Sequence, residues 1–197
     1  MCLDRRRPAV FLDRDGVINR DRADFVKSWA ELELLPGALA ALRCLAAAEV
    51  AVVIVTNQSC VGRGLLSLAA LHDIHARLLA AIEREGGRVD GVFFCPHRPE
   101  DHCPCRKPRP GLLLRAADEL RLDLAASWLV GDAERDISAA VACGVRPLLV
   151  LTGKGAAQRG LIEQTRGAPV PVLSDIHAAA GFVLENMRHS TLGAGAW

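Results

Sequence analysis

The sequence predicts an α/β protein with a parallel sheet between two layers of helices, a three-layer Rossmann-like arrangement. Short apolar runs alternate with longer stretches that are apolar at helical spacing, which is the pattern of repeated strand–helix–strand units. The runs are apolar at almost every position, which is typical of strands buried on both faces. With 197 residues, 51% of them hydrophobic, the chain suits one domain with a sizeable core.

The elements follow in order along the chain. Strands are expected at 9–12, 50–55, 91–94, 127–131 and 146–151, and helices at 37–49, 67–85, 110–122 and 134–143. Residues 165–175 are expected to form a loop with a short strand, before a final helix near 175–188. No stretch between these elements suits a separate cap domain. We therefore expect one domain over 1–189 with an inserted loop at 95–105, followed by a mobile tail at 190–197.

Composition excludes several classes of partner. The chain has 24 basic and 23 acidic residues, 4% aromatic residues and no Tyr, so it lacks the basic field and stacking surfaces of a nucleic-acid binder. Its most apolar run, 50–55, is too short to cross a bilayer, and its first residues lack the apolar region of a signal peptide. We therefore expect a cytoplasmic, monomeric protein with neither nucleic acid nor a membrane as partner.

The first expected strand ends in "FLDRDGVIN". Alternation along an extended chain predicts that Asp13 and Asp15 lie on the same side and that Arg14 points away, and Gly16 allows a turn directly after them. Right-handed crossovers place the carboxyl ends of all strands at one edge of the sheet, where active sites of such folds lie. Two close carboxylates there usually bind a hard cation or divide acid and base roles.

Three other segments bring polar groups to the same edge. The second strand runs into "VTNQSCVGRG", the fourth into "VGDAERD" with Asp132 and Asp136, and "CRKPRPG" places Lys107 just before a helix N-terminus. Any one of these aspartates alone could be a turn or capping residue. Together, acids for a cation and a hydroxyl and a lysine for an anion favour phosphoryl transfer.

The motifs "DRDGVIN", "TNQS", "CRKP" and "GDAERD" resemble, in order, the four motifs of the haloacid dehalogenase (HAD) superfamily of phosphatases. More narrowly, "FLDRDGVIN", "VTNQS" with "GRG", and "CPHRPEDHCPCRKPRPGLL" are similar to a family of heptose bisphosphate and histidinol-phosphate phosphatases. The resemblance covers Val10 to Val150. It implies a HAD-like fold and Mg²⁺-dependent hydrolysis of a sugar phosphate, foremost the C7 phosphate of D-glycero-D-manno-heptose 1,7-bisphosphate, with histidinol phosphate as the alternative substrate.

The same resemblance assigns roles to residues of this chain. It makes Asp13 the nucleophile that forms an aspartyl-phosphate, and Asp15 the acid that protonates the leaving oxygen and then activates water. Thr56 and Lys107 hold the phosphoryl group. The implied Mg²⁺ ligands are Asp13, Asp132 and the backbone carbonyl of Asp15. The implied substrate contacts, on loops that cover the site, are Asn19, Asp21, Arg22, Asn57, Gln58, Ser59, Arg63 and Arg106. Asp21 and Arg22 fit an exposed polar loop equally well.

Two positions depart from the family pattern. Cys60 stands where the family usually has Gly, so either a positive-φ turn is altered there or a thiol lies near the phosphate loop. Ala133 stands where relatives often carry a basic residue, which removes one anion contact. Arg135 is a candidate replacement, although nothing in the sequence requires it.

Four potential ligands of a second metal lie in one loop. Cys95, His97, Cys103 and Cys105 form the pattern C-x-H-x5-C-x-C, a soft donor set that selects Zn²⁺ over Mg²⁺. Seven cysteines, an odd number, do not suit a disulfide framework. Four protein ligands close a tetrahedron, so the zinc is expected to be structural, and His102 is the spare histidine.

Three other interpretations of this loop stay open: a Cys103/Cys105 redox pair, a loop without metal, and a catalytic zinc, which would need an open coordination position. A different class of function is a zinc-stabilised binding or redox protein that keeps the fold without catalysis. The intact Asp13, Asp15 and Lys107 argue against it. Because Arg106 and Lys107 follow Cys105 directly, we expect the loop to act as a clamp that aims both bases.

Overall fold

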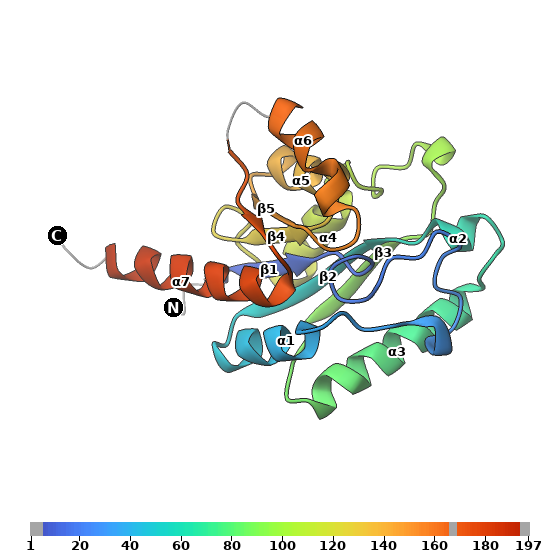
Figure 1. The fold of residues 1–197 in the computed structure, drawn as a ribbon, viewed down its shortest axis with the longest axis horizontal. Helices are drawn as coiled ribbons and strands as arrows, with labels where there is room; N and C mark the ends of the chain where they lie inside the picture. Colours follow the sequence, from blue (N-terminus) through green and yellow to red (C-terminus); the bar gives the residue numbers. More distant parts are fainter. Residues whose placement is uncertain (1–5, 166–168, 194–197) are drawn as a thin grey trace.

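The computed structural model describes residues 6–165 and 169–193. Within these residues six parallel strands form one sheet in the order β3-β2-β1-β4-β5-β6 (Figure 1). The strands are β1 (Ala9–Leu12), β2 (Ala51–Asn57), β3 (Gly91–Cys95), β4 (Trp128–Gly131), β5 (Arg146–Val150) and β6 (Val172–Leu173). The chain builds the sheet outward from β1 in one direction and then in the other, so the strand order reverses between β1 and β4. In open α/β sheets this point is where ligands bind.

Helices cover both faces of the sheet. They are α1 (Ala38–Ala47), α2 (Ser59–Gly62), α3 (Leu68–Arg84), α4 (Gly111–Leu120), α5 (Glu134–Ala142), α6 (Gly155–Thr165) and α7 (Ile176–Gly193), with 3₁₀ turns η1 (Trp29–Glu31) and η2 (Pro99–Asp101). Figure 1 shows α1 and α3 on one side of the sheet and α5 and α6 on the other. Among the described residues, no helix combines the length and the apolar character needed to span a membrane.

The strands feed two hydrophobic cores because successive side chains point to opposite faces. Val10 and Leu12 of β1 belong to the core shared with α1, α3 and α7. Ala9 and Phe11 belong to the core shared with α4 and α5. All four are buried, which is why β1 reads as a continuous apolar run rather than an alternating one.

The predicted α/β architecture is confirmed, and the five predicted strands and the first four predicted helices are present with ends shifted by at most two residues. The predicted short strand is β6. Helix α6 was not predicted, because its segment "GAAQRGLIEQT" buries only Gly155 and Ile162 and carries almost no apolar periodicity. The final helix runs on to Gly193, into the predicted tail, and the last four residues lie outside the described part.

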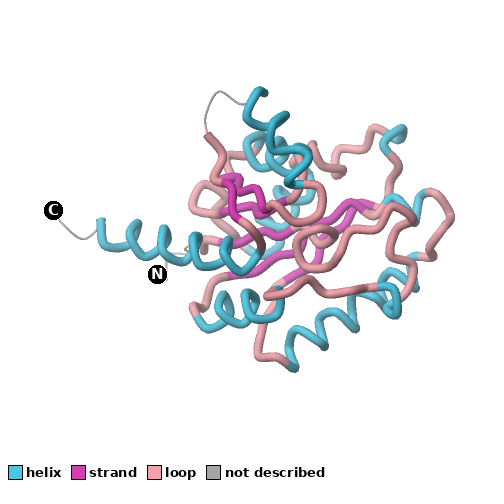
Figure 2. Tube along the Cα trace, viewed as in Figure 1, coloured by secondary structure: helices cyan, strands magenta, loops and turns pink. Residues whose placement is uncertain are grey.

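Two long connections leave the carboxyl edge of the sheet. Residues 13–37 join β1 to α1 and contain the turn η1, and residues 96–110 join β3 to α4 and contain η2. Figure 2 draws both almost entirely as loop. Neither connection contains a helix longer than one 3₁₀ turn, in keeping with the expectation of loops in place of a cap domain.

Candidate active site

Three aspartates meet where β1 and β4 end side by side. Asp13 follows β1, Asp132 follows β4, and Asp136 lies in the first turn of α5. A carboxylate oxygen from each lies within 4.8 Å of the other two, and the residues are only 2%, 0% and 0% exposed. We call this group, with Lys107 and Arg135, the carboxylate cluster. Asp136 was expected at the same edge from its place after the fourth predicted strand, but without a role.

Lys107 lies inside this cluster. Its side chain is completely buried, and its Nζ lies 3.1 Å from Asp13 Oδ1 and 2.7 Å from Asp136 Oδ1. The same Nζ donates to the carbonyl oxygen of Val55 at 2.6 Å. A single lysine thus contacts two of the three carboxylates. The buried ammonium is therefore paired, but it forms no ion pair with Asp132 among the contacts of the described residues.

Asn57 holds the backbone of Lys107 rather than projecting away from it. Its Nδ2 donates to the Lys107 carbonyl at 3.0 Å, and its Oδ1 accepts from the Lys107 N–H at 3.1 Å. The two bonds fix the peptide from which the lysine side chain reaches Asp13. The predicted role of Asn57 in binding substrate is untested, but in this structure it is a positioning residue.

The electrostatics separate the roles of the aspartates. Burial works to raise the pKa of Asp13, but the charges of Lys107 and Arg135 and the N–H of Arg14 hold it below its ordinary value. Burial, together with the charges of Asp13 and Asp136, raises the pKa of Asp132 to about 7. Asp13 is therefore held ionised, as a nucleophile must be, whereas Asp132 has a more distant counter-charge, with Nη2 of Arg135 3.7 Å from its Oδ1.

Asp132 fits a hard cation. Its Oδ1 is buried without a hydrogen-bond partner among the described residues, while its Oδ2 accepts from the Lys154 N–H at 2.9 Å. A Cβ at Gly16 would come within 2.0 Å of Oδ2, and a Cβ at Gly153 within 2.1 Å. Only glycine therefore fits at these two positions, where the backbone packs closely against the carboxylate. An orphaned carboxylate oxygen beside Asp13 is the donor chemistry that Mg²⁺ prefers.

The donor set thus supports Asp13 and Asp132 as the expected Mg²⁺ ligands. Asp136 is less available, because Lys107 contacts its Oδ1 and the Ala133 N–H donates to its Oδ2 at 3.1 Å. The carbonyl of Asp15 as a further ligand stays a prediction.

Asp15 lies in a second polar group, beside the first. Its carboxylate accepts from Asn19 Nδ2 and from Gln58 Nε2, both at 2.8 Å. The same Gln58 Nε2 contacts Thr56 Oγ1 at 2.8 Å, so one amide ties the predicted acid to the predicted phosphoryl-binding hydroxyl. The structure therefore brings Asn19, Gln58 and Thr56 together around Asp15, and their contact with substrate stays a prediction.

Arg14 does not point away from this group, as strict alternation predicts. Strand β1 ends at Leu12, and the chain then turns so that the N–H groups of Ile18 and Asn19 both donate to the Arg14 carbonyl, at 2.8 and 3.1 Å. Its buried guanidinium reaches both oxygens of Asp15 at 2.9 Å and Gln58 Oε1 at 3.0 Å. The expectation was wrong because the alternation rule stops where the strand stops.

Arg14 also contacts a buried histidine that the sequence analysis did not single out. Its Nη1 lies 3.2 Å from Nε2 of His75, a residue of α3. Burial, and then the charge of Arg14, lowers the pKa of His75 to about 3. His75 is therefore neutral at physiological pH, with Nε2 as the acceptor.

The remaining predicted substrate residues fall into different surroundings. Asp21 is half-buried, pairs with Lys154 Nζ at 2.8 Å and lines a hollow of about 390 Å³ with Arg20, Leu35, Thr152 and Gly153. Gly153 also touches Asp132, so this hollow borders the carboxylate cluster. Ser59 is buried at the start of α2.

Arg22 and Arg63 lie on the surface in this structure. Arg22 pairs with Asp24 at 3.0 Å, and the exposed Arg63 lies 4.0 Å from Glu100. Arg106 donates to the carbonyl of His97 at 3.2 Å, which fastens it to the cysteine loop. Contact of all three with substrate stays a prediction.

The two departures have structural explanations. Cys60 lies within the short helix α2, so no positive φ is needed at that position. Its buried Sγ lies 3.7 Å from Gln58 Oε1, and burial raises the pKa of the thiol, which makes it inert. Ala133 is buried and precedes α5, while Nη2 of Arg135 lies 3.5 Å from Asp13 Oδ2.

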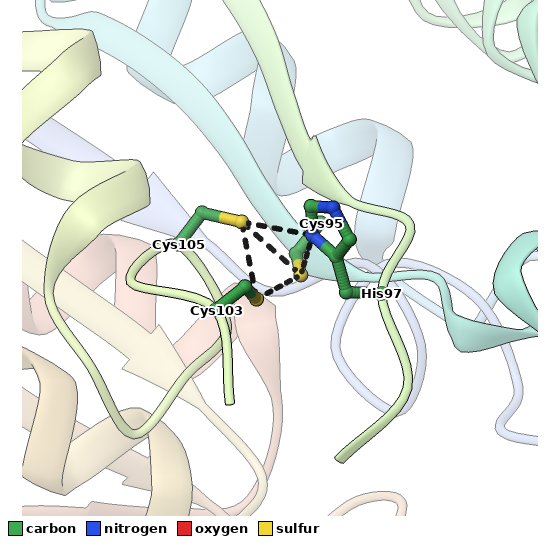
Figure 3. Close-up of side chains that lie close together, drawn as sticks. All are labelled: Cys95, His97, Cys103 and Cys105. Atoms are coloured by element: carbon green, nitrogen blue, oxygen red, sulfur yellow. Dashed lines mark hydrogen bonds between the residues drawn. The ribbon is translucent and has the colours of Figure 1, made fainter. Parts of the chain in front are cut away.

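The four predicted ligands of the cysteine loop point toward one another (Figure 3). The Sγ atoms of Cys95, Cys103 and Cys105 lie 3.4 to 3.5 Å apart. Nδ1 of His97 lies 3.5 Å from Cys95 Sγ and 3.3 Å from Cys105 Sγ. We call this group the thiol cluster. His102 is exposed and is not one of the four.

These distances match the outline of a tetrahedral site. Four sulfur ligands about 2.3 Å from a central Zn²⁺ lie about 3.8 Å from one another, and a nitrogen ligand lies slightly nearer. Burial raises the pKa of the Cys95 thiol. Burial also opposes ionisation of Cys103, but donation from the Cys105 and Cys95 thiols lowers its pKa. The group can hold a soft cation, which would draw the remaining protons off.

The thiol cluster is connected to the carboxylate cluster through the backbone. Cys95 is the last residue of β3 and lies opposite Asn57 of β2, and its carbonyl accepts from the Gln58 N–H at 2.7 Å. Cys105 lies two residues before Lys107. Both ends of the loop therefore join residues that contact Lys107 or Asp15.

Comparisons with known proteins agree with this arrangement. A family model described as haloacid dehalogenase-like hydrolase matches residues 3–140, and one described as HAD-hydrolase-like matches 104–179. The chain is 45% identical over 179 residues to a D-glycero-beta-D-manno-heptose-1,7-bisphosphate 7-phosphatase from Bordetella bronchiseptica, covering 89% of this chain and 97% of that protein. A protein of the same name from Pseudomonas aeruginosa is 39% identical over 183 residues, covering 91% and 99%.

A solved crystal structure is similar to this chain in fold. The crystal structure of the D,D-heptose 1,7-bisphosphate phosphatase from B. bronchiseptica, complexed with magnesium and phosphate, superposes with a TM-score of 0.84 at 42% identity. The match covers 91% of this chain and 99% of that one. The fold and the length of the two proteins therefore correspond almost throughout.

Proposed function

We propose a specific substrate for this chain, which belongs to the haloacid dehalogenase-like hydrolases and is a phosphatase of that family. With Mg²⁺, it removes the C7 phosphate of D-glycero-β-D-manno-heptose 1,7-bisphosphate. The observation that carries the chemistry is Asp13, held ionised beside Lys107 at the end of β1. Next to it lies an Asp132 oxygen that accepts no hydrogen bond from the described residues. The substrate, including its anomer, is proposed from the names of relatives at 39 and 45% identity.

In the first step we infer that Asp13 attacks phosphorus. Its Oδ1 already accepts from the Arg14 N–H at 2.7 Å and contacts Lys107 at 3.1 Å, which leaves Oδ2 to form the new bond. As the aspartyl-phosphate forms, the bond from phosphorus to the sugar oxygen breaks, and Asp15 gives that oxygen its proton. In the second step Asp15 takes a proton from water, which attacks the aspartyl-phosphate and releases phosphate and free Asp13.

Mg²⁺ bound to Asp13 and Asp132 supplies the charge that this chemistry needs. At about 4 Å and an effective dielectric constant near 20, a carboxylate and one phosphate charge repel by about 4 kcal/mol. Lys107 offsets only part of this repulsion, because it also contacts Asp136.

We also propose that the thiol cluster binds a structural Zn²⁺. The three sulfurs lie at nearly equal distances from one another, which favours a common central ion over a particular Cys103/Cys105 redox pair. Four protein ligands leave no position for water or substrate, so the ion has a structural role. Thiols that must stay reduced to bind a metal suit a cytoplasmic protein. The monomeric state stays a prediction.

The deciding experiment is a substrate comparison. The purified protein with Mg²⁺ is assayed against both anomers of the heptose bisphosphate and against histidinol phosphate, with Asp13→Asn as the control for contaminating phosphatases. We expect the highest kcat/KM for the β anomer. A higher value for histidinol phosphate would replace the proposed substrate, and failure to hydrolyse any phosphate ester would favour the non-catalytic binding or redox protein.

A further inference from the structure

Arg135 faces the two carboxylate oxygens that the rest of the protein leaves least occupied. From the first turn of α5, its Nη2 lies 3.5 Å from Asp13 Oδ2 and 3.7 Å from Asp132 Oδ1. The other oxygens of these carboxylates are taken, by Lys107 and the Arg14 N–H for Asp13 and by the Lys154 N–H for Asp132. Arg135 therefore lies where attack on phosphorus and cation binding are expected to take place.

The guanidinium of Arg135 is poorly satisfied in this position. Both contacts are longer than the 2.7–3.2 Å of a normal N–H···O bond, and both use the same nitrogen. Its Nε is buried and has no hydrogen-bond partner among the described residues. A guanidinium has five N–H donors in a planar fork. A half-buried arginine whose Nε lacks a partner and whose Nη2 makes only long contacts suits a bound acceptor that completes the site.

The charges of the cluster point to an anion as that acceptor. With all three aspartates ionised, Lys107 and Arg135 leave one net negative charge, and a Mg²⁺ ion would turn this into one net positive charge. The cation is expected to occupy Asp132 Oδ1, which Arg135 now faces, and the two positive groups would then repel each other. The guanidinium can relieve that repulsion by binding a phosphate dianion, whose oxygens match its fork.

We infer that Arg135 binds the transferring phosphoryl group, as a catalytic residue that supplies the anion contact absent at Ala133. This rests on the proposed phosphatase function. Ala133 itself is buried, and its methyl group offers an anion no donor. Arg135, two residues further on, is 29% exposed at its side chain and still reaches Asp13.

The inference predicts opposite changes in two binding constants when Arg135→Gln is compared with the wild type. Binding of Mg²⁺ alone, by titration calorimetry, should tighten because a competing positive charge is gone. Binding of inorganic phosphate in saturating Mg²⁺ should weaken by about 10- to 100-fold, and kcat/KM should fall with it. A purely structural role would weaken both constants together and would overturn the inference.

Two further variants make the test specific. Ala133→Lys combined with Arg135→Gln should recover at least part of the phosphate affinity, and no gain over Arg135→Gln would contradict the assignment to position 133. Arg159→Gln is the matched control, since it removes an exposed arginine of α6 that pairs with Glu163 and should leave both constants unchanged. Unchanged phosphate affinity in Arg135→Gln, while the wild type turns over substrate, would overturn this inference alone. An inactive wild type would instead overturn the proposed function.

Discussion

The carboxylate cluster and the thiol cluster contain similar numbers of acidic side chains, but they differ in how completely their polar atoms are paired. Each gathers three acidic side chains at the carboxyl edge of the sheet, together with His97 in the thiol cluster and with Lys107 and Arg135 in the carboxylate cluster. In the thiol cluster the ligand atoms lie 3.3 to 3.5 Å apart along the five contacts that join them, so the group is closed. In the carboxylate cluster Lys107 lies among the acids, and one oxygen of Asp132 accepts no hydrogen bond within the described part of the chain. The closed thiol cluster fits a structural role, and the incompletely paired carboxylate cluster fits a catalytic role.

Burial separates the two regions further. The three aspartates are at most 2% exposed, whereas three of the four members of the thiol cluster are exposed or half-buried on a loop. Uncompensated charge in a buried site is costly, and the favourable way to remove the cost is to bind a cation and then an anion. The sheet thus places a site that lacks charge balance at its centre, and the thiol cluster lies at its periphery, on the loop that leads to Lys107.

The largest effect is expected at the open site. Asp13→Asn should lower kcat by about four orders of magnitude or more, because the amide is no nucleophile, while thermal unfolding stays near that of the wild type since asparagine keeps the shape and one acceptor. Rates and melting curves measure the two effects. Asp118→Asn, on the exposed face of α4, is the control. Activity that survives Asp13→Asn would sink the assignment of the nucleophile.

A smaller loss is expected when the closed site is opened. Cys103→Ser should lower the zinc content measured by elemental analysis, and it should lower kcat/KM by about 10- to 100-fold through displacement of Arg106 and Lys107. Cys44→Ser, which changes an exposed thiol, should alter neither. Loss of zinc with unchanged kinetics would refute the clamp and leave the loop as an independent unit.

A prediction for His75 concerns its role as a neutral hydrogen-bond acceptor for Arg14, which pairs with Asp15. Its folded pKa of about 3 lies below its ordinary value of 6.5, so the unfolded chain binds the extra proton between those values. The contribution of neutral His75 to the free energy of unfolding therefore keeps its full value above pH 6.5 and decreases as the pH falls toward 3. The loss due to His75 is on the order of 2 kcal/mol at pH 5. Denaturant unfolding at pH 7.5 and pH 5 should show a smaller acid loss for His75→Gln. An equal loss in both proteins would mean that Arg14 does not depend on a neutral acceptor.

The smallest effect is expected where the two regions meet. Asn57→Ala removes both bonds to the Lys107 backbone and should lower kcat by about tenfold with little change in KM, because the lysine is displaced rather than removed. Asn57→Asp keeps only the acceptor and should lie between alanine and wild type. The double variant with Cys103→Ser should lose less than the product of the single losses if both residues act through Lys107. A full product would show that they act independently.

Much of the site could be predicted because its signals are local. Asp13 and Asp132 directly follow strands that apolar runs reveal, Lys107 precedes a predicted helix, and parallel strands bring such ends to one edge. The thiol cluster could be predicted because four ligands fall within eleven residues of one loop. Helix α6 could not, because only two of its residues are buried and it therefore lacks a periodic apolar face.

The contacts that only the fold reveals join residues from separate elements. No pattern in the sequence pairs Arg14 with His75 of α3, or Asn57 with the backbone of Lys107, fifty positions later. The alternation that puts Arg14 opposite Asp15 fails because a turn replaces the strand after Leu12.

The sequence by itself determined the fold class and predicted which donor side chains gather at one edge of the sheet, because the hydrophobic period and the donor type can be identified residue by residue. The tertiary structure decided which acid stays ionised, which lacks a partner and where Arg135 is aimed. Those properties depend on burial and on distances of a few ångströms between segments far apart in the chain, and only packing sets these.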